Sequence, residues 1–354
     1  MEQNRNFLSQ HKKNKSCNTF IIAEAGVHHD CDLRKAKELI NAAAEAGADT
    51  IKFQTYKVDT LVTHWAPTYW EQNNGRKYKT QADCFQKRDK FNFEDYQVLN
   101  EYAKKKEINF CSTPFDHQSV RWLNDLDIPF LKVASGDLDN YPLLEEIART
   151  QKPIILSTGA SYFKEVSNAV DFLRSKGVKE LALMHCTLSY PTPNGEANLY
   201  RIAELKKLFP EITIGYSDHT VPDEDIIIPA IAVALGAEIV EKHFTLDRTL
   251  PEDDHYHSAD TTLLRRMIKH IKLAEEATAI TAEIVDSEMP ARKNARRSLV
   301  ANEVIPQGTV ITKDMLIPKR PGGGISPSLF HKTLGRKLRT TMQRDQQILW
   351  DYLE

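Results

Sequence analysis

The chain has 354 residues, of which 41% are hydrophobic, and its 47 basic and 49 acidic side chains nearly cancel. This length suits a large α/β barrel of about 250 residues followed by a small second domain. The near-zero net charge argues against a general binder of nucleic acids or membrane surfaces. No apolar run reaches the ~20 residues of a membrane span, and residues 1–16 contain no apolar signal segment, so we expect a cytoplasmic protein.

A repeated strand–helix pattern fills most of the chain after a polar, basic stretch, 1–17, that is predicted to be disordered. Strands are predicted over 20–24, 50–54, 108–113, 129–134, 153–157, 181–186, 212–216 and 239–243. Helices are predicted over 33–46, 93–106, 116–125, 141–150, 162–176, 198–208, 224–235 and 261–278. Eight such units within residues 18–282 predict a (β/α)8 TIM barrel. A doubly wound sheet is the alternative, although no Gly-x-Gly-x-x-Gly follows the first strand.

One long polar insertion interrupts the repeat. Residues 57–90 follow the second predicted strand and contain Trp65, Tyr69, Trp70 and Tyr78. In a barrel this insertion would rise from the carboxyl face, where active sites lie. A loop of this length is usually functional or disordered, so we expect a lid or an interface element.

The composition changes after the last predicted helix. Residues 283–296 are charged, contain Pro290 and are predicted to be a linker. Residues 297–354 combine short apolar runs with turn signals such as Pro306-Gln-Gly308. This pattern predicts a small, β-rich second domain.

Polar side chains gather where the predicted strands end. The carboxyl ends of barrel strands meet at one rim, so these groups should converge. Serine, threonine and aspartate there could equally cap the next helix, but capping does not explain Lys52, Lys132 and Lys242. Burying three lysines is costly without anions. The lysines therefore predict a small substrate that carries both a phosphate and a carboxylate.

Two histidines, His219 and His243, follow the seventh and eighth predicted strands, which are neighbours in a barrel. For an arbitrary pair, one exposed loop histidine and one core histidine would be the simpler interpretation. Here the flanking Ser-Asp-His and Glu-Lys-His contexts favour a metal site. Two imidazoles completed by water and a substrate oxygen suit Mn²⁺ or a similar divalent ion, which we expect to be exchangeable.

Two loop segments follow predicted strands at the same rim. The stretch 251–257, Pro-Glu-Asp-Asp-His-Tyr-His, is either a solvated loop or a set of carboxylates for the hydroxyl groups of a polyol. Pro191 and Pro193 fix an extended segment after Tyr190. The rigid segment would hold the Tyr190 side chain in one direction. The alternative interpretation is that Tyr190 only packs against its neighbours.

Eight motifs occur in the same order as in a known family. They are Ile22-Ala-Glu24-x-Gly26, Lys52-Phe-Gln54, Ser112-Thr-Pro-Phe-Asp116, Lys132-Val-Ala-Ser135, His185-Cys-Thr187, Tyr190-Pro-Thr-Pro193, Gly215-Tyr-Ser-Asp-His-Thr220 and Glu241-Lys-His-Phe-Thr245. Together they resemble the sialic acid synthase family, which makes nonulosonic acids from phosphoenolpyruvate. Lys319-Arg-Pro-Gly looks like the antifreeze-like (SAF, β-clip) domain of that family. The resemblance runs from about residue 18 to the end and implies a TIM barrel followed by a SAF domain.

The resemblance also implies roles for individual residues. Phosphoenolpyruvate would contact Lys52, Thr113, Lys132, Ser135 and Ser217. The metal, with Mn²⁺ ahead of Mg²⁺ or Co²⁺, would bind His219 and His243. The amino sugar would meet Gln54, Asp137, Tyr190, Asp254 and, from the partner subunit of a domain-swapped homodimer, Arg320. Catalysis would involve Glu24 as the acid/base residue, with Lys52, Lys132 and His219.

The implied reaction is a condensation of the EC 2.5.1 class. C3 of phosphoenolpyruvate attacks the metal-polarised aldehyde of an open-chain N-acetylated amino sugar, water captures C2, and phosphate leaves by C–O cleavage. The chain departs from the family pattern at His28–Cys31, Leu188 and Glu252. By the resemblance, these positions lie near the acceptor pocket, so the departures leave the identity of the acceptor sugar undecided. It could be N-acetylmannosamine, a 6-phosphate version of the sugar, or a diacetamido hexose that gives legionaminate or pseudaminate.

The residues alone are also compatible with three other functions. A 3-deoxy-aldulosonate phosphate synthase shares this chemistry but would not need the second domain. A Schiff-base aldolase would use Lys132 or Lys52 as its nucleophile. A binding protein could use the C-terminal domain alone, although it would not require polar groups along the barrel rim.

Overall fold

The chain forms two compact units, Met1–Ala279 and Ile280–Glu354, each with its own apolar core. The computed structural model describes residues 10, 12–13, 17–70, 78–251, 254–280 and 282–354. Most of the predicted disordered N-terminus lies outside the described residues, as do residues 71–77 of the insertion and 252–253 of the loop after the eighth strand. The boundaries 18–282, 283–296 and 297–354 remain predictions.

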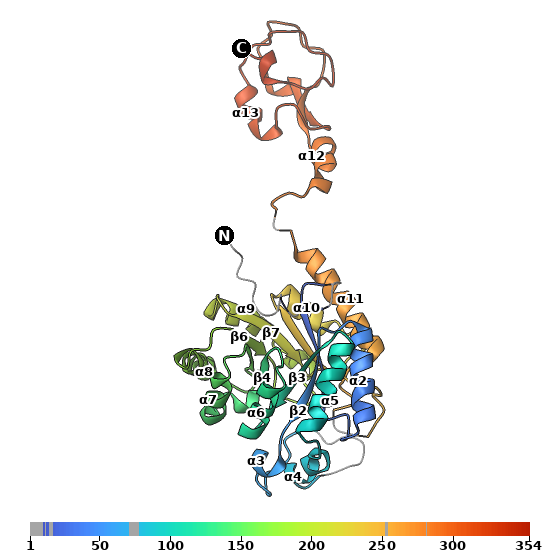
Figure 1. Cartoon of the computed structure of the whole chain (residues 1–354). Helices are drawn as coiled ribbons and strands as arrows, with labels where there is room; N and C mark the ends of the chain where they lie inside the picture. The colour runs from blue at the N-terminus through green and yellow to red at the C-terminus, as the bar shows by residue number, and fades with distance from the viewer. Residues whose placement is uncertain (1–9, 11, 14–16, 71–77, 252–253, 281) are drawn as a thin grey trace. The chain divides into compact units, whose positions relative to one another are not determined.

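Eight parallel strands build the first unit, and they confirm the predicted barrel (Figure 1). They are β1 (Phe20–Gly26), β2 (Thr50–Thr55), β3 (Asn109–Pro114), β4 (Leu131–Val133), β5 (Ile154–Ser157), β6 (Leu181–His185), β7 (Thr213–Asp218) and β8 (Ile239–His243). They pair in the order β3-β2-β1-β8-β7-β6-β5-β4. The two outermost strands in this order, β3 and β4, lie against each other, so the sheet curls into a nearly closed TIM-like barrel.

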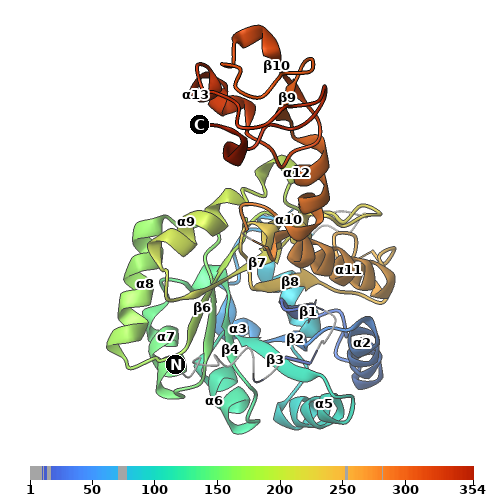
Figure 2. The same ribbon diagram turned by 90° about the horizontal axis from the view of Figure 1, so that it is seen from above.

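Helices surround the barrel (Figure 2). They are α2 (Leu33–Ala46), α5 (Phe93–Lys105), α6 (His117–Asp125), α7 (Tyr141–Arg149), α8 (Phe163–Ser175), α9 (Tyr200–Leu208), α10 (Ile228–Ala234) and α11 (Thr261–Thr278). In the described part of the chain, no helix combines the length and the apolar character that a bilayer crossing requires.

Helix α2 shows how the sequence sets these units. The Asp32 carboxylate caps its first turn by accepting from the backbone N–H groups of Arg34 and Lys35. Leu39 and Ile40 belong to a fully buried apolar face. Gly47 ends the helix with φ of +94°, a conformation that suits glycine. The chain then passes directly into β2.

Most elements differ from their predicted bounds by one or two residues, and two of the differences have a clear local cause. Strand β4 ends at Val133, because the chain turns at once into a 3-10 helix that carries Ser135 and Asp137. Helix α10 starts at Ile228, four residues later than predicted. The Asp223 carboxylate accepts from the N–H groups of Asp225 and Ile226, and this turn delays the helix.

The barrel interior is filled by a separate apolar layer. Its members are Phe20, Ile22, Cys111, Phe130, Ile155, Ala182, Met184 and Ile239. Side chains of a strand alternate between its two faces. The residue two positions further along each strand therefore also points inward, one layer nearer the carboxyl end. Polar residues at those positions therefore face the same interior space.

The second unit is small and rich in short strands and turns, as predicted. The antiparallel pair β9 (Ser298–Ala301) and β10 (Leu316–Lys319) is preceded by α12 (Met289–Ala295) and followed by α13 (Phe330–Thr333). Its core includes Leu299, Ile305 and Ile348. Arg320 comes directly after β10 and has an exposed side chain.

Candidate active site

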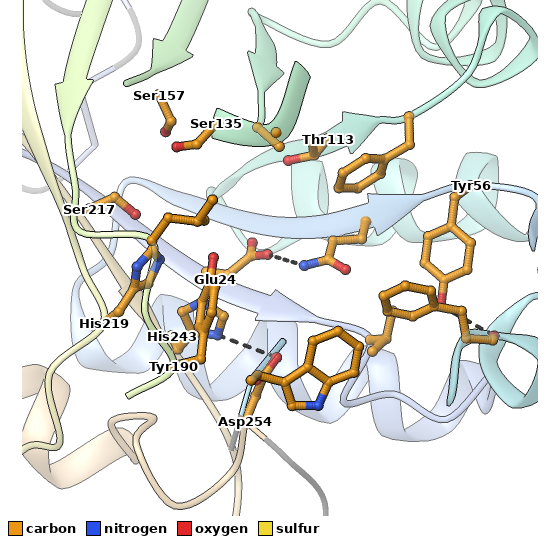
Figure 3. Close-up of a pocket in the computed structure, with 18 of the residues that line it drawn as sticks. Glu24, Tyr56, Thr113, Ser135, Ser157, Tyr190, Ser217, His219, His243 and Asp254 are labelled. Atoms are coloured by element: carbon orange, nitrogen blue, oxygen red, sulfur yellow. Dashed lines mark hydrogen bonds and ion pairs between the residues drawn. The ribbon is translucent and has the colours of Figure 1, made fainter. Parts of the chain in front are cut away.

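A cavity of about 370 Å³ opens above the apolar layer, and the strand ends supply its floor. Figure 3 shows Glu24, Thr113, Ser135, Ser157, Ser217, His219 and His243 facing this space. Glu24, Thr113 and Ser157 each lie two residues after a member of the apolar layer, namely Ile22, Cys111 and Ile155. The strand period therefore accounts for the convergence of these polar groups.

Two buried lysines and two buried glutamates form the centre of the floor. The Nζ of Lys52 lies 2.6 Å from Glu24 Oε2 and 3.5 Å from Glu241 Oε1. The Nζ of Lys132 lies 3.9 Å from Glu241 Oε2. Burial raises the pKa of Glu24 to about 7, although Lys52 opposes the shift. Burial acts the same way on Glu241, but Lys132 and Lys52 outweigh it and hold its pKa below the usual value.

These pKa directions give the two glutamates different charges near neutral pH. Glu241 is an ionised counter-charge, whereas Glu24 gains or loses a proton close to pH 7. Lys52 stays charged, because its carboxylate partners outweigh burial and raise its pKa to about 12. Burial lowers the pKa of Lys132, against the attraction of Glu241. An arriving anion can therefore be balanced by protonation of Glu24.

Hydroxyl groups surround the lysines. Lys52 Nζ donates to Thr113 Oγ1 over 3.1 Å, and Lys132 Nζ donates to Ser157 Oγ over 2.6 Å. Ser217 Oγ donates to Glu241 Oε1 over 3.3 Å. These contacts hold donors and cations around one point, a pattern that suits the oxygens of a phosphate or carboxylate.

Ser135 completes this ring and depends on a glycine. Its Oγ accepts from the N–H of Gly159 over 2.9 Å and lies 3.1 Å from Cys186 Sγ. A Cβ at position 159 would stand 2.8 Å from that sulfur and 2.9 Å from the serine oxygen. Only glycine therefore lets the backbone approach closely enough to orient Ser135.

Histidines occupy one side of the cavity. The rings of His219 and His243 are 5.4 Å apart, and His219 Nδ1 lies 2.8 Å from the Thr187 carbonyl oxygen. Because a carbonyl only accepts, Nδ1 must donate, which leaves the lone pair of Nε2 free for a ligand. Burial lowers the pKa of both rings, that of His219 to about 4, so both are neutral near pH 7.

A carboxylate and a third imidazole adjoin His243. Asp254 Oδ2 lies 3.8 Å from His243 Nδ1, and Asp254 Oδ1 lies 3.7 Å from His257 Nε2. One ligand atom from each residue can be chosen so that all three lie within 4.8 Å of one another. Neutral imidazoles and a carboxylate are ligands that divalent ions accept. The donors present thus fit a divalent metal.

The predicted insertion forms the opposite wall. Tyr56 precedes it, and its lining residues are Leu61, Val62, Tyr69, Trp70, Gln81, Cys84, Phe85 and Arg88, several of them in α3 (Val58–Leu61) and α4 (Gln81–Phe85). Trp70 lies against Phe85, with ring centroids 5.8 Å apart. Arg88 is already engaged, because its guanidinium meets Asp30 and the Cys84 sulfur. The wall is therefore largely aromatic and apolar.

The sequence-predicted site residues divide between the two units. Those that line the cavity are Glu24, Lys52, Gln54, Thr113, Lys132, Ser135, Asp137, Tyr190, Ser217, His219, His243 and Asp254. Arg320 belongs to the other unit. Tyr190 points inward: its ring centroid lies 4.4 Å from that of His219. Tyr190 is therefore part of the cavity lining beside the histidines.

The interpretation of Lys242 was wrong. We expected it to face a substrate anion together with Lys52 and Lys132. Strand alternation instead turns it away from the cavity, where its Nζ lies 2.9 Å from Asp218 Oδ2 and both side chains are fully buried. Lys242 also donates to the Thr220 carbonyl over 2.6 Å. Its charge is compensated within the protein and says nothing about the substrate.

Three site residues were absent from the predicted set: Glu241, Ser157 and His257. Glu241 and Ser157 could have been found from the two-residue period, because each follows an apolar inward residue, Ile239 or Ile155. No spacing rule predicts His257, because its place depends on how the loop after β8 folds.

Residues 39–282 match the NeuB family and residues 296–354 match the SAF domain. The chain belongs to the NeuB family. This membership confirms the resemblance to sialic acid synthases and the expected SAF domain.

Characterised relatives of this NeuB protein include synthases from bacteria and animals. The N,N'-diacetyllegionaminic acid synthase of Legionella pneumophila is 37% identical over 360 residues, with both chains fully covered. The human N-acetylneuraminate-9-phosphate synthase is 33% identical over 350 residues, which cover 95% of this chain and 92% of the human one. The crystal structure of a sialic acid synthetase from Leptospira borgpetersenii, in complex with citrate, has a TM-score of 0.69 at 35% identity, covering 78% of this chain and 90% of that one. These relatives support an enzyme that condenses phosphoenolpyruvate with a sugar.

Proposed function

We propose that this NeuB protein joins phosphoenolpyruvate to an open-chain, unphosphorylated N-acetylated amino sugar of the N-acetylmannosamine type. The products would be a nonulosonic acid and inorganic phosphate. The observation that carries this proposal is the arrangement within one cavity: two buried lysines with hydroxyl partners lie on the floor, beside a cluster of neutral histidines. The first group suits a doubly anionic donor and the second suits an aldehyde activated by a metal.

The donor would bind on the floor. Phosphate and carboxylate oxygens would accept from Lys52, Lys132 and the surrounding hydroxyls Thr113, Ser135 and Ser217. The lysines are already paired with Glu24 and Glu241, so a bound dianion adds uncompensated negative charge. Glu24 relieves this by taking up a proton, since its pKa is already raised to about 7.

Protonated Glu24 is then placed for acid catalysis. Its Oε1 accepts from Gln54 Nε2 over 3.1 Å, which orients the carboxyl group within the cavity. As C3 of phosphoenolpyruvate attacks the aldehyde carbon, the aldehyde oxygen gains a proton that Glu24 can supply. Water then adds to C2, and phosphate leaves with cleavage of the C2–O bond. A divalent ion held at His243 would polarise the aldehyde oxygen as a Lewis acid.

The apolar wall favours one group of acceptors over another. Arg88 is the wall's cation among the described lining residues, and Asp30 and Cys84 already engage it. A 6-phosphate would therefore meet no available positive charge among the wall residues that the structure describes, and burying it against them would be costly. Methyl groups, in contrast, can pack on Trp70 and Phe85. This observation favours a second candidate acceptor, a diacetamido hexose that would give a legionaminate-type product.

Product analysis tests the function directly. The purified full chain would be incubated with phosphoenolpyruvate, a divalent ion and each acceptor in turn: N-acetylmannosamine, its 6-phosphate, and a 2,4-diacetamido-trideoxy hexose. We expect phosphate release and a nonulosonic acid by mass spectrometry with the first or third acceptor. Phosphate release only with the 6-phosphate would contradict the acceptor proposal. Full activity in excess chelator would remove the metal from the mechanism.

The domain-swapped homodimer and the role of Arg320 are also part of this proposal. If Arg320 acts in the partner's cavity, inactive Lys132→Met chains mixed with inactive Arg320→Ala chains should regain activity. The mixed dimer contains one cavity with both residues intact. Absence of any recovery after subunit exchange would argue against a shared site.

A further inference from the structure

Each of the eight barrel strands supplies one side chain to the cavity floor, from within the strand or directly after its end. In order from β1 to β8 these side chains are Glu24, Lys52, Thr113, Lys132, Ser157, Cys186, Ser217 and Glu241, and all of them line the cavity. Most carry a charge or a hydroxyl group, which suits the binding of an anion. The exception is the thiol of Cys186, to which the proposed function assigns no role.

The place of Cys186 follows from the same two-residue period as the rest of the floor. Met184 belongs to the apolar layer inside the barrel, and Cys186 follows it by two residues. The thiol is buried. Its sulfur lies 3.1 Å from Oγ of Ser135, which stands on the 3-10 helix after β4. Cys186 is therefore held against one of the hydroxyl groups that would bind phosphoenolpyruvate.

The hydroxyl group of Ser135 has three hydrogen-bonding positions, one O–H donor and two acceptor lone pairs. The N–H of Gly159 donates to one lone pair over 2.9 Å. The S–H of Cys186 can donate to the other, because burial raises the pKa of the thiol, against the effects of Ser135 and Lys132, and keeps it protonated near neutral pH. The serine proton is then left for a ligand in the cavity.

The opposite arrangement would use the serine proton on sulfur, which is a weak acceptor. A phosphate or carboxylate oxygen on the floor is a much stronger acceptor and favours the first arrangement. We propose that Cys186 is a positioning residue for the donor site: its thiol donates to Ser135 Oγ and so directs the serine hydroxyl toward the anion. This inference rests on the proposed function, because it takes phosphoenolpyruvate as that anion.

A double-mutant cycle tests this role, with the dissociation constant of phosphoenolpyruvate measured by calorimetric titration of the full chain. Cys186→Ala should raise the constant about three- to tenfold, as expected for loss of one hydrogen bond. Cys186→Ser should bind more tightly than Cys186→Ala, because a hydroxyl group can also donate to Ser135. When Ser135→Ala is already present, adding Cys186→Ala should change the constant by less than about twofold.

The matched control is Cys17→Ala, which removes a buried thiol that does not line the cavity and should leave the dissociation constant unchanged. Far-UV circular dichroism would check the folding of each variant. If Cys186→Ala does not fold, Cys186→Val takes its place in the cycle, because valine fills the space of the thiol and still removes the donor.

Two outcomes would overturn the inference. One is parent-like binding by Cys186→Ala. The other is an equal loss from Cys186→Ala with and without Ser135→Ala, since the thiol would then not act through the serine. A chain that shows the expected cycle but makes no nonulosonic acid would contradict only the proposed function. A chain that makes the product without coupling between Cys186 and Ser135 would contradict only this inference.

Discussion

The floor and the wall of the cavity are built on different principles. The floor consists of strand residues whose direction follows from the two-residue period, and its lysines, glutamates and hydroxyls contact one another at 2.6–3.9 Å. The wall comes from the insertion after β2 and presents aromatic and aliphatic groups such as Trp70 and Phe85 to the cavity. In the proposed function, the barrel strands would bind the donor and the insertion would contact the acceptor.

Because of this contrast, substitutions on the floor and substitutions in the wall should have different effects on the reaction. A change on the floor alters the charge of a buried, mutually paired group, so it should affect the reaction with every acceptor. A change in the wall alters contacts with one part of one substrate. Changes that act on only one of the two surfaces therefore test whether the floor and the wall are independent.

Replacing Glu24 by Gln should lower kcat by about 100- to 10,000-fold, because the amide cannot donate the proton required by the aldehyde oxygen. Thermal unfolding should change little, because Glu24, with its pKa raised to about 7, is already partly protonated near neutral pH, and Lys52 keeps Glu241, 3.5 Å away, as its counter-charge. Steady-state phosphate release with saturating substrates measures the effect. A kcat within fivefold of the parent would remove Glu24 from the chemistry.

Replacing Lys242 by Met should cost about 3–5 kcal/mol of unfolding free energy, because it leaves Asp218 charged and unpaired in the interior. Urea unfolding measures this loss. The matched control is the double variant Lys242→Met with Asp218→Asn, which removes both charges and should recover part of the stability. If Lys242→Met instead raises KM for phosphoenolpyruvate in a stable protein, the lysine does face the substrate.

The affinity for phosphoenolpyruvate should fall above pH 7. Glu24, with its pKa raised to about 7 by burial, is protonated below this pH and a carboxylate above it. Since bound dianion requires the protonated form, the dissociation constant should rise by up to about tenfold per pH unit on the alkaline side. Calorimetric titration between pH 6 and 9 measures it. Glu24→Gln provides the comparison, because it removes the protein's titration and leaves that of the ligand; an unchanged slope in this variant would contradict the linkage.

Replacing Trp70 by Ala should have the smallest effect, roughly a tenfold rise in KM for the sugar, as expected for loss of one aromatic contact. KM for phosphoenolpyruvate should stay within twofold. Initial rates with each substrate varied in turn separate the two. An equal rise in both constants would show that the wall and the floor are not independent. Trp65→Ala, on an exposed side chain of the same insertion that does not line the cavity, serves as the control.

Much of the barrel and its floor could be predicted from the sequence, because both depend on local periodicity. The eight strands and the inward direction of Lys52 and Lys132 follow from alternation, and the ends of helices such as α2 follow from Asp32 and Gly47. The same alternation turns Lys242 away from the cavity and toward Asp218, so a lysine at a strand end does not by itself indicate a substrate contact.

The wall and the loop after β8 could not be predicted in this way. Trp70 and Phe85 are distant in sequence and meet only through the folding of the insertion. His257 reaches His243 through backbone bonds to Ala259, and no sequence period encodes these bonds. Contacts of this kind depend on the folding of whole loops, so local periodicity does not predict them.

The alternation of side chains in β8 also makes the site sensitive to the register of this strand. Glu241 faces the lysines of the floor, and Lys242 beside it faces Asp218 on the outer side of the strand. Sliding β8 by one residue would exchange these two directions. A third positive charge would then enter the cavity while two carboxylates met behind the barrel. A one-residue deletion between Gly236 and Glu241 would therefore damage folding and catalysis together, although it removes no residue of the site.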